Sequence, residues 1–163
     1  MKRLILLRHG KSDWNHNLPD EKRTLKKRAF DDVELVAEAF QKKSDFKFTL
    51  YSSHAVRAQT TAKLFAEKLK DRVEAFQIKN EFYTFDANEV LQLVFKLPNP
   101  ENNVMLVGHN PAYTQLVNYF CDDFRVDNLP TTGLVELQFE ADDWQAIKKA
   151  KLNLHLFPKN LRD

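Results

Sequence analysis

Arginine and histidine side chains stand in this chain where they could bind and attack a phosphoryl group. Arg8 and His9 directly follow the four apolar residues Leu4–Leu7. His109 follows a second four-residue apolar run and a glycine. An arginine presents a planar fork of donors that matches a phosphate oxyanion, and a histidine can act near neutral pH as a base, a nucleophile or a donor. The two histidines are therefore candidates for the attacking group.

Buried strands are expected to position these side chains. An unbroken apolar run of this length is typical of a strand buried on both faces of a parallel sheet. Ligands of open α/β sheets bind at the carboxyl ends of the strands, so His9 and His109 should lie at one edge of the sheet.

A third basic residue, Arg57, falls in the first turn of a predicted helix, for which Ser52 or Ser53 is the expected cap. A cation near a helix N-terminus is electrostatically unfavourable, and a bound anion would remove that conflict. The plain alternative is a surface arginine. Arg57 is therefore a candidate anion ligand.

Apolar periodicity predicts the remaining elements. Helices are expected near residues 33–40, 58–69, 90–95 and 111–120, and strands near residues 4–7, 46–51, 73–78, 104–107, 135–139 and 152–156. Because helices and strands alternate, the sequence predicts a three-layer α/β/α fold with a mostly parallel sheet and a late antiparallel strand. We expect one domain over residues 1–163, since this length suits a single core.

The composition is that of an ordinary globular protein. The formal net charge is +2, which does not predict binding to nucleic acid or to a membrane surface. The single cysteine, Cys121, excludes an internal disulfide and suits a reducing compartment. The N-terminus lacks the long apolar stretch of a signal peptide, and a cytoplasmic protein is expected.

Three motifs together resemble the histidine phosphatase superfamily (branch 1). They are Arg8-His9-Gly10, Ser52-Ser53 followed by Arg57-Ala58 and Thr61-Ala62, and Gly108-His109-Asn110-Pro111. The short chain and the run from Arg8 to Trp14 most resemble the SixA-type phosphohistidine phosphatases. The chain departs from that pattern at Thr24, where the family has proline, and at Ala29, where it usually has glycine.

The resemblance implies a phosphoglycerate-mutase-like fold and a phosphatase that needs neither metal nor cofactor. It assigns the nucleophile to His9, which the residues alone could not distinguish from His109. His109 would donate a hydrogen bond, and Arg8 and Arg57 would bind phosphoryl oxygens. The resemblance also suggests Asn15 as a phosphate contact, and the first motif adds Gly10, Lys11 and Ser12 as residues that could line the pocket. Trp14 is expected to serve packing rather than substrate stacking.

The general acid decides the substrate class. An ester leaving group needs a proton from a carboxylic acid, whereas the weak P–N bond of phosphohistidine can break with little help. Glu81 is the candidate acid, ahead of Asp86 and Glu89, and the alternative is that Glu81 is a plain surface carboxylate. His54 is expected at the surface.

We therefore expect hydrolysis of phosphohistidine on a protein. The resemblance makes a histidine phosphotransfer domain a possible partner. Two alternatives stay open, namely a phosphatase of small phosphomonoesters and a non-catalytic module that binds phosphate or phosphoproteins. A binding module is disfavoured because all four core residues are present.

Overall fold

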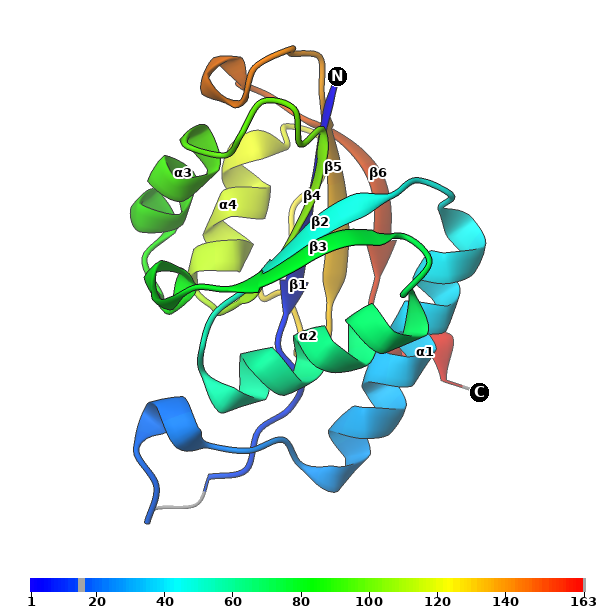
Figure 1. Ribbon diagram of the computed structural model, residues 1–163, viewed down its shortest axis with the longest axis vertical. Helices are drawn as coiled ribbons and strands as arrows, with labels where there is room; N and C mark the ends of the chain where they lie inside the picture. Colours follow the sequence, from blue (N-terminus) through cyan, green and yellow to red (C-terminus); the bar gives the residue numbers. More distant parts are fainter. Residues whose placement is uncertain (15–16, 163) are drawn as a thin grey trace.

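A central sheet between two helical layers forms the protein in a computed structural model that describes residues 1–14 and 17–162 (Figure 1). The strands are β1 (Lys2–Arg8), β2 (Phe48–Ser52), β3 (Val73–Ile78), β4 (Asn103–Gly108), β5 (Leu134–Phe139) and β6 (Lys151–Leu156). The α-helices are α1 (Lys27–Lys43), α2 (Val56–Lys68), α3 (Ala87–Phe95), α4 (Ala112–Phe120) and α5 (Pro158–Leu161). No helix within the described ranges is long and apolar enough to cross a membrane.

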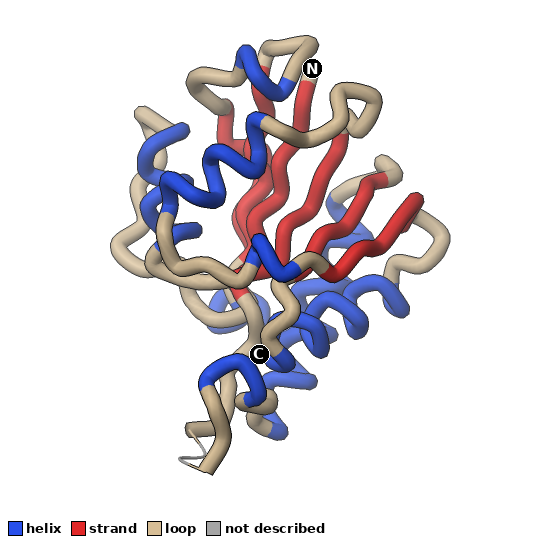
Figure 2. The backbone as a smooth tube through the Cα atoms, turned by 60° about the vertical axis from the view of Figure 1, so that its left-hand side comes forward, coloured by secondary structure: helices blue, strands red, loops and turns tan. Residues whose placement is uncertain are grey.

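The strand order of the sheet is β3-β2-β4-β1-β5-β6. The first four of these strands are parallel, and β5 runs antiparallel to both β1 and β6. This confirms the mostly parallel sheet with a late antiparallel strand. Figure 2 shows the strands side by side in one sheet.

The register of β1 and β4 brings the two histidine motifs together. Arg8 is paired with Gly108 at the last position of the two strands. His9 and His109 therefore leave the sheet side by side, as expected from the apolar runs before them. The backbone N–H of His9 continues the pairing by donating to the carbonyl of Gly108 at 3.1 Å.

Both faces of β1 are buried, which explains its unbroken apolar run. Ile5 and Leu7 pack in the core formed with α1 and α2, whereas Leu4 and Leu6 pack in the core formed with α3 and α4. All four side chains are fully inaccessible to solvent. These two helix pairs lie on opposite faces of the sheet (Figure 1).

The start of α2 differs from the sequence prediction. Its N-cap is Ala55, and no side chain caps the helix. Ser52 instead ends β2, and the Ser53 hydroxyl contacts His109 at 2.8 Å. The prediction of a serine cap was wrong because Ser52 still belongs to β2 and Ser53 lies three residues before α2 begins. Arg57 is the second residue of α2, within the expected first turn.

The short helix α5 was not predicted, because four residues are too few to show an apolar stripe. The C-terminal segment is tied back to α1 instead. Arg162 makes two hydrogen bonds to Asp32 Oδ1, of 3.1 and 2.7 Å, and one of 2.6 Å to Oδ2. The side chain of Asp32 is only 8% exposed, so this ion pair is mostly shielded from water.

Candidate active site

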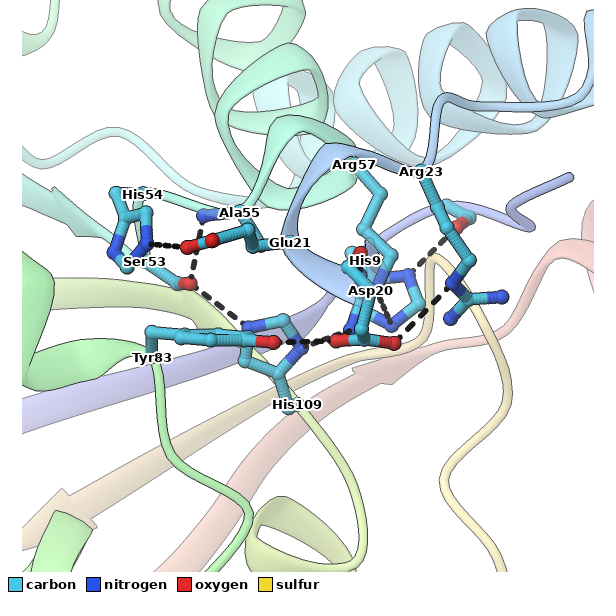
Figure 3. A network of polar contacts seen from close by, with 11 residues as sticks. His9, Asp20, Glu21, Arg23, Ser53, His54, Ala55, Arg57, Tyr83 and His109 are labelled. Carbon is cyan, nitrogen blue, oxygen red and sulfur yellow. Dashed lines mark hydrogen bonds and ion pairs between the residues drawn. The ribbon is translucent and has the colours of Figure 1, made fainter. Parts of the chain in front are cut away.

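The predicted side chains of His9, Arg57 and His109 converge at the edge of the sheet where β1 and β4 end (Figure 3). Arg57 Nε lies 3.3 Å from His9 Nε2, and Arg57 Nη2 lies 3.5 Å from His109 Nδ1. The rings of His9 and His109 are 5.3 Å apart between centroids. Arg8, His9 and Arg57 line the same cavity. The structure therefore groups two guanidiniums and two imidazoles at one edge of the sheet, although His109 is fully buried and is not one of the residues that line the cavity.

His9 is held in the tautomer that a nucleophile needs. Its Nδ1 lies 2.7 Å from the carbonyl oxygen of Gly10, and a carbonyl can only accept, so the proton is on Nδ1. Burial lowers the pKa of His9 well below its ordinary value, despite the bond to Gly10, and the charges of His109 and Arg57 act in the same direction as burial. The ring is neutral at pH 7, and Nε2 carries a lone pair that faces Arg57.

His109 is fully buried and is oriented by Ser53. Its Nε2 lies 2.8 Å from the Ser53 hydroxyl oxygen, and that oxygen accepts a hydrogen bond from the backbone N–H of Ala55 at 3.2 Å. Burial, followed by the charge of Arg57, lowers the pKa of His109 to about 3. Its Nδ1 faces the guanidinium of Arg57. The remaining ring nitrogen of His109 is thus directed at Arg57, which itself lines the cavity.

The guanidinium of Arg57 is satisfied by Asp20, a residue that the sequence analysis did not single out. Arg57 Nη2 donates to Asp20 Oδ2 at 2.9 Å, and Nη1 donates to the Asp20 carbonyl at 2.6 Å. The Tyr83 hydroxyl donates to the same Oδ2 at 2.6 Å. Partial burial alone would raise the pKa of Asp20, but the bonds from Tyr83 and Arg57 bring it below its ordinary value. The carboxylate is therefore ionised.

The guanidinium of Arg8 makes fewer hydrogen bonds than that of Arg57. Its Nη1 donates to the carbonyl of Leu129 at 2.9 Å, but its Nε is buried without a hydrogen-bond partner. The loop that follows Leu129 closes this side of the site, since the Thr132 N–H lies 3.1 Å from the carbonyls of both Arg8 and His9. A buried N–H without an acceptor is costly, so Arg8 has a donor to offer an oxyanion.

Comparison with known proteins identifies the family. The profile of the histidine phosphatase superfamily (branch 1) matches residues 4–83, which include Arg8, His9 and Arg57. The chain belongs to this superfamily. Together with the convergent side chains, this makes the protein a phosphatase. No curated protein sequence matches it significantly.

Solved structures share the fold of this histidine phosphatase. The protein histidine phosphatase SixA, complexed with tungstate, aligns with a TM-score of 0.79 at 20% identity, covering 98% of this chain and 99% of its own. A protein from Agrobacterium tumefaciens assigned as SixA aligns with 0.79 at 23% identity, covering 96% and 98%. A mycobacterial glucosyl-3-phosphoglycerate phosphatase aligns with 0.68 at 16% identity, covering 94% and 98%. At these identities the alignments establish the fold.

The other predicted site residues take different places around the histidine phosphatase site. Lys11 and Ser12 line the cavity. Gly10 adjoins it, but its N–H donates to Thr61 Oγ1 at 2.9 Å and its carbonyl holds His9. Asn15, the predicted phosphate contact, lies outside the described residues.

The candidate acids do not reach the cavity. Glu81 is exposed in the short 3-10 helix Asn80–Phe82 and is not one of the described residues that line the cavity. Asp86 accepts from the N–H of Asn88 at the start of α3, and Glu89 accepts from the Thr84 hydroxyl. Asp20 is instead the carboxylate that enters. Its position in an aperiodic charged loop gave no signal in the sequence.

Two residues for which the sequence analysis predicted no role in the site lie close to it. Trp14, expected to serve packing, is 69% exposed and lines the cavity. His54, expected at the surface, is half-buried, with its Nε2 at 2.8 Å from Glu21 Oε2 and its ring edge-on to Tyr83. Periodicity could not reveal either position, because both residues lie outside regular elements.

Proposed function

We propose that this protein hydrolyses phosphohistidine on other proteins through a covalent phosphohistidine at His9. His9 Nε2 attacks phosphorus while the P–N bond to the substrate histidine breaks, and the leaving imidazole takes a proton from water. Water then attacks the phosphorus on His9, which releases phosphate and restores the neutral ring. Arg8 and Arg57 bind the phosphoryl oxygens and stabilise the charge of both transition states.

His109 serves as the third phosphoryl ligand in this proposal. If the Ser53 hydroxyl donates to Nε2, the proton of the His109 ring is on Nδ1, which faces Arg57. A phosphoryl oxygen at that point would accept from both His109 Nδ1 and Arg57 Nη2. The bond would form without charging the His109 ring.

The observation on which the proposal depends is the protonation state of the Asp20 carboxylate in the cavity. Asp20 is the one acidic side chain among the described cavity-lining residues, and the bonds from Arg57 and Tyr83 favour its ionised form. An ionised carboxylate has no proton for an alkoxide leaving group. Phosphohistidine does not need that proton, because its P–N bond is weak. The chemistry of this site therefore suits phosphohistidine better than an ester.

The structural neighbours support this proposal and one alternative. Two of them are named as SixA, and the SixA studied with tungstate is a protein histidine phosphatase. The mycobacterial neighbour is named as a phosphatase of glucosyl-3-phosphoglycerate, a small phosphomonoester. Hydrolysis of small phosphomonoesters is therefore the second candidate function, with Glu81 as its acid if the segment that carries Glu81 moves.

The proposed partner is a phosphorylated protein such as a histidine phosphotransfer domain. Nucleic acid and membranes are not part of the proposal, because the net charge of the whole chain is only +2. We place the protein in the cytoplasm, where the thiol of its single cysteine would stay reduced.

The test compares phosphate release from a phosphorylated histidine phosphotransfer domain and from p-nitrophenyl phosphate. Wild type should act on the domain with the higher kcat/KM, and His9→Ala should lose at least about a thousandfold, as expected for removal of a nucleophile. Rapid acid quench should capture the phosphoryl group on His9. Preference for the ester, with a large loss in Glu81→Gln, would favour the small-molecule alternative. Failure to label His9 in a folded protein would favour a binding module.

A further inference from the structure

The cavity carries more positive charge than a phosphoryl group can neutralise. Its described lining residues include four cationic side chains, Arg8, Lys11, Arg23 and Arg57, and one anionic side chain, Asp20. This leaves a surplus of three positive charges. A phosphoryl group with a pKa near 6 brings up to about two negative charges at neutral pH. A positive charge therefore remains at the mouth when the phosphoryl group is bound.

Arg23 is the cavity-lining arginine with the most unpaired hydrogen-bond donors. It is only 7% exposed, yet its Nη1 is buried without a hydrogen-bond partner. Its Nε lies 3.3 Å from Asp20 Oδ1, in a geometry that makes an ion pair but no hydrogen bond. Asp20 is shared, since its other oxygen binds Arg57. The guanidinium of Arg23 thus has capacity for a further carboxylate.

Trp14 fixes the guanidinium of Arg23 in place. The guanidinium carbon lies 3.8 Å from the centroid of the indole ring, and the ring itself is 69% exposed. Tryptophan and arginine are both enriched at the energetic centres of protein interfaces. The exposed Lys11 lines the same cavity. We call Lys11, Trp14 and Arg23 the cationic rim.

Neighbouring carboxylates do not cancel the charge of the rim. Asp13 and Glu21 belong to the same loop, but neither of them lines the cavity. Glu21 is directed at His54, with 2.8 Å between Oε2 and Nε2. A free phosphate or a small ester could bind at His9 without covering Trp14. The rim therefore suits a ligand that extends beyond the phosphoryl group.

We propose that the cationic rim docks an acidic surface of the protein that carries the phosphohistidine. This inference rests on the proposed function and extends it to the partner. A carboxylate beside the phosphohistidine would pair with the charges of Lys11 and Arg23, and the partner's side chains would cover Trp14. Such complementarity favours encounter with acidic partners and weakens with added salt.

Kinetics on three phosphohistidine substrates test the rim. They are an acidic histidine phosphotransfer domain, a basic histone phosphorylated on histidine, and free phosphohistidine. The acidic domain should have the lowest KM, and that KM should rise with salt. Lys11→Glu and Trp14→Ala should each lower the preference for the acidic domain over free phosphohistidine by about tenfold, mainly through KM. Arg23→Gln should do the same.

A matched control is Lys22→Ala, which removes an exposed charge from the same loop but from a residue outside the cavity lining. It should leave the preference unchanged. Equal losses on all three substrates in Lys11→Glu and Trp14→Ala would overturn the docking proposal, because the rim would then act on the phosphoryl group itself. An unchanged preference in both variants would overturn it as well. These two exposed positions keep the test valid if Arg23→Gln fails to fold.

Binding separates this inference from the proposed function. Trp144 is fully buried, so a change in tryptophan fluorescence on binding reports on Trp14. The phosphorylated acidic domain should change the fluorescence of His9→Ala and bind more weakly in Lys11→Glu. Binding by His9→Ala without hydrolysis by wild type would overturn the proposed function and retain the docking surface. Absence of binding would overturn the docking surface, whatever the activity on free phosphohistidine.

Discussion

Asp20 occupies both terminal nitrogens of the Arg57 guanidinium, one through its carboxylate at 2.9 Å and the other through its own carbonyl at 2.6 Å. Arg57 is 1% exposed, so this contact supplies the counter-charge of a buried cation. In the proposed mechanism, a phosphoryl group on His9 would need the same nitrogens. Substrate and Asp20 would therefore compete for Arg57.

Replacing Asp20 should strengthen the binding of anions. In Asp20→Asn, we expect the inhibition constant of inorganic phosphate to fall by about threefold to tenfold, because one charged competitor has been removed. The control is Glu21→Gln, which removes a charge from the adjacent residue that contacts His54 instead of Arg57. Weaker phosphate binding in Asp20→Asn would mean that Asp20 positions Arg57 rather than competing for it.

The hydroxyl of Ser53 should set the orientation and tautomer of His109. We expect Ser53→Ala to lower kcat by about tenfold with a smaller change in KM, as for loss of a group that orients a catalytic ring. Ser52→Ala is the matched control, because the Ser52 hydroxyl donates to the carbonyl of Ser53 and is not bonded to His109. Nitrogen-15 shifts of the His109 ring should change only in Ser53→Ala. Equal kcat values in the two variants would contradict the assignment.

The two buried histidines should make the fold sensitive to acid. Their pKa values in the native protein lie below the ordinary value of 6.5. Below that pH, the two histidines are therefore protonated in the unfolded chain but stay neutral in the native protein. Stability should therefore fall as the pH drops from 6.5 towards 5, by up to about 2 kcal/mol for each buried ring. Urea denaturation at pH 7 and pH 5 measures the difference. His109→Asn should lose less stability than wild type over this interval, and an equal loss would argue against the buried neutral ring.

A side chain at Gly108 should strain the end of β4. A Cβ atom there would lie 2.5 Å from the hydroxyl oxygen of Tyr113, a side chain that is 1% exposed. We expect Gly108→Ala to cost about 1–3 kcal/mol, the range for overpacked sites. At Gly10 the nearest contact of an added Cβ would be 3.1 Å, so Gly10→Ala should cost less. Denaturant midpoints compare the two, and the reverse order would be inconsistent with this packing.

The ion pair between Arg162 and Asp32 should contribute to stability. Removing Arg162 leaves a mostly buried carboxylate without its partner, so Arg162→Ala should lower the unfolding free energy by about 1–3 kcal/mol. Lys42→Ala is a suitable comparison, because its pair with Glu38 is exposed, at 72% and 44%. That change should cost less than about 1 kcal/mol. A loss from Arg162→Ala no larger than from Lys42→Ala would show that the C-terminal contact is dispensable.

The sequence predicted the site residues that lie at the ends of strands and at the start of a helix. His9 and His109 follow apolar strands, so periodicity placed them near one edge of the sheet, whereas Arg57 at the start of a helix could equally have been a surface residue. The register that pairs Arg8 with Gly108 then brought the two histidines together. The family motifs added what periodicity could not, namely a role for each residue.

The missed features depend on contacts between loops. Asp20 reaches Arg57 and Tyr83 across 37 and 63 residues of sequence, and no local pattern encodes such pairings. Glu81 was the favoured acid because it follows a strand, but it is exposed in the short helix Asn80–Phe82. Tyr83, two residues later, is the side chain that contacts Asp20. Predicting which loop residue enters a cavity requires the paths of both loops.

The position of β1 in the sheet has a consequence for motion at the site. Its backbone is hydrogen-bonded along both edges, to β4 and to β5, so His9 extends from a strand that cannot open without breaking the centre of the sheet. Asp20 lies in the short 3-10 helix Asp20–Lys22, which is joined to the site through side chains and one carbonyl. A substrate could thus displace the Asp20 carboxylate by shifting a surface segment alone, while His9, the proposed nucleophile, stays fixed.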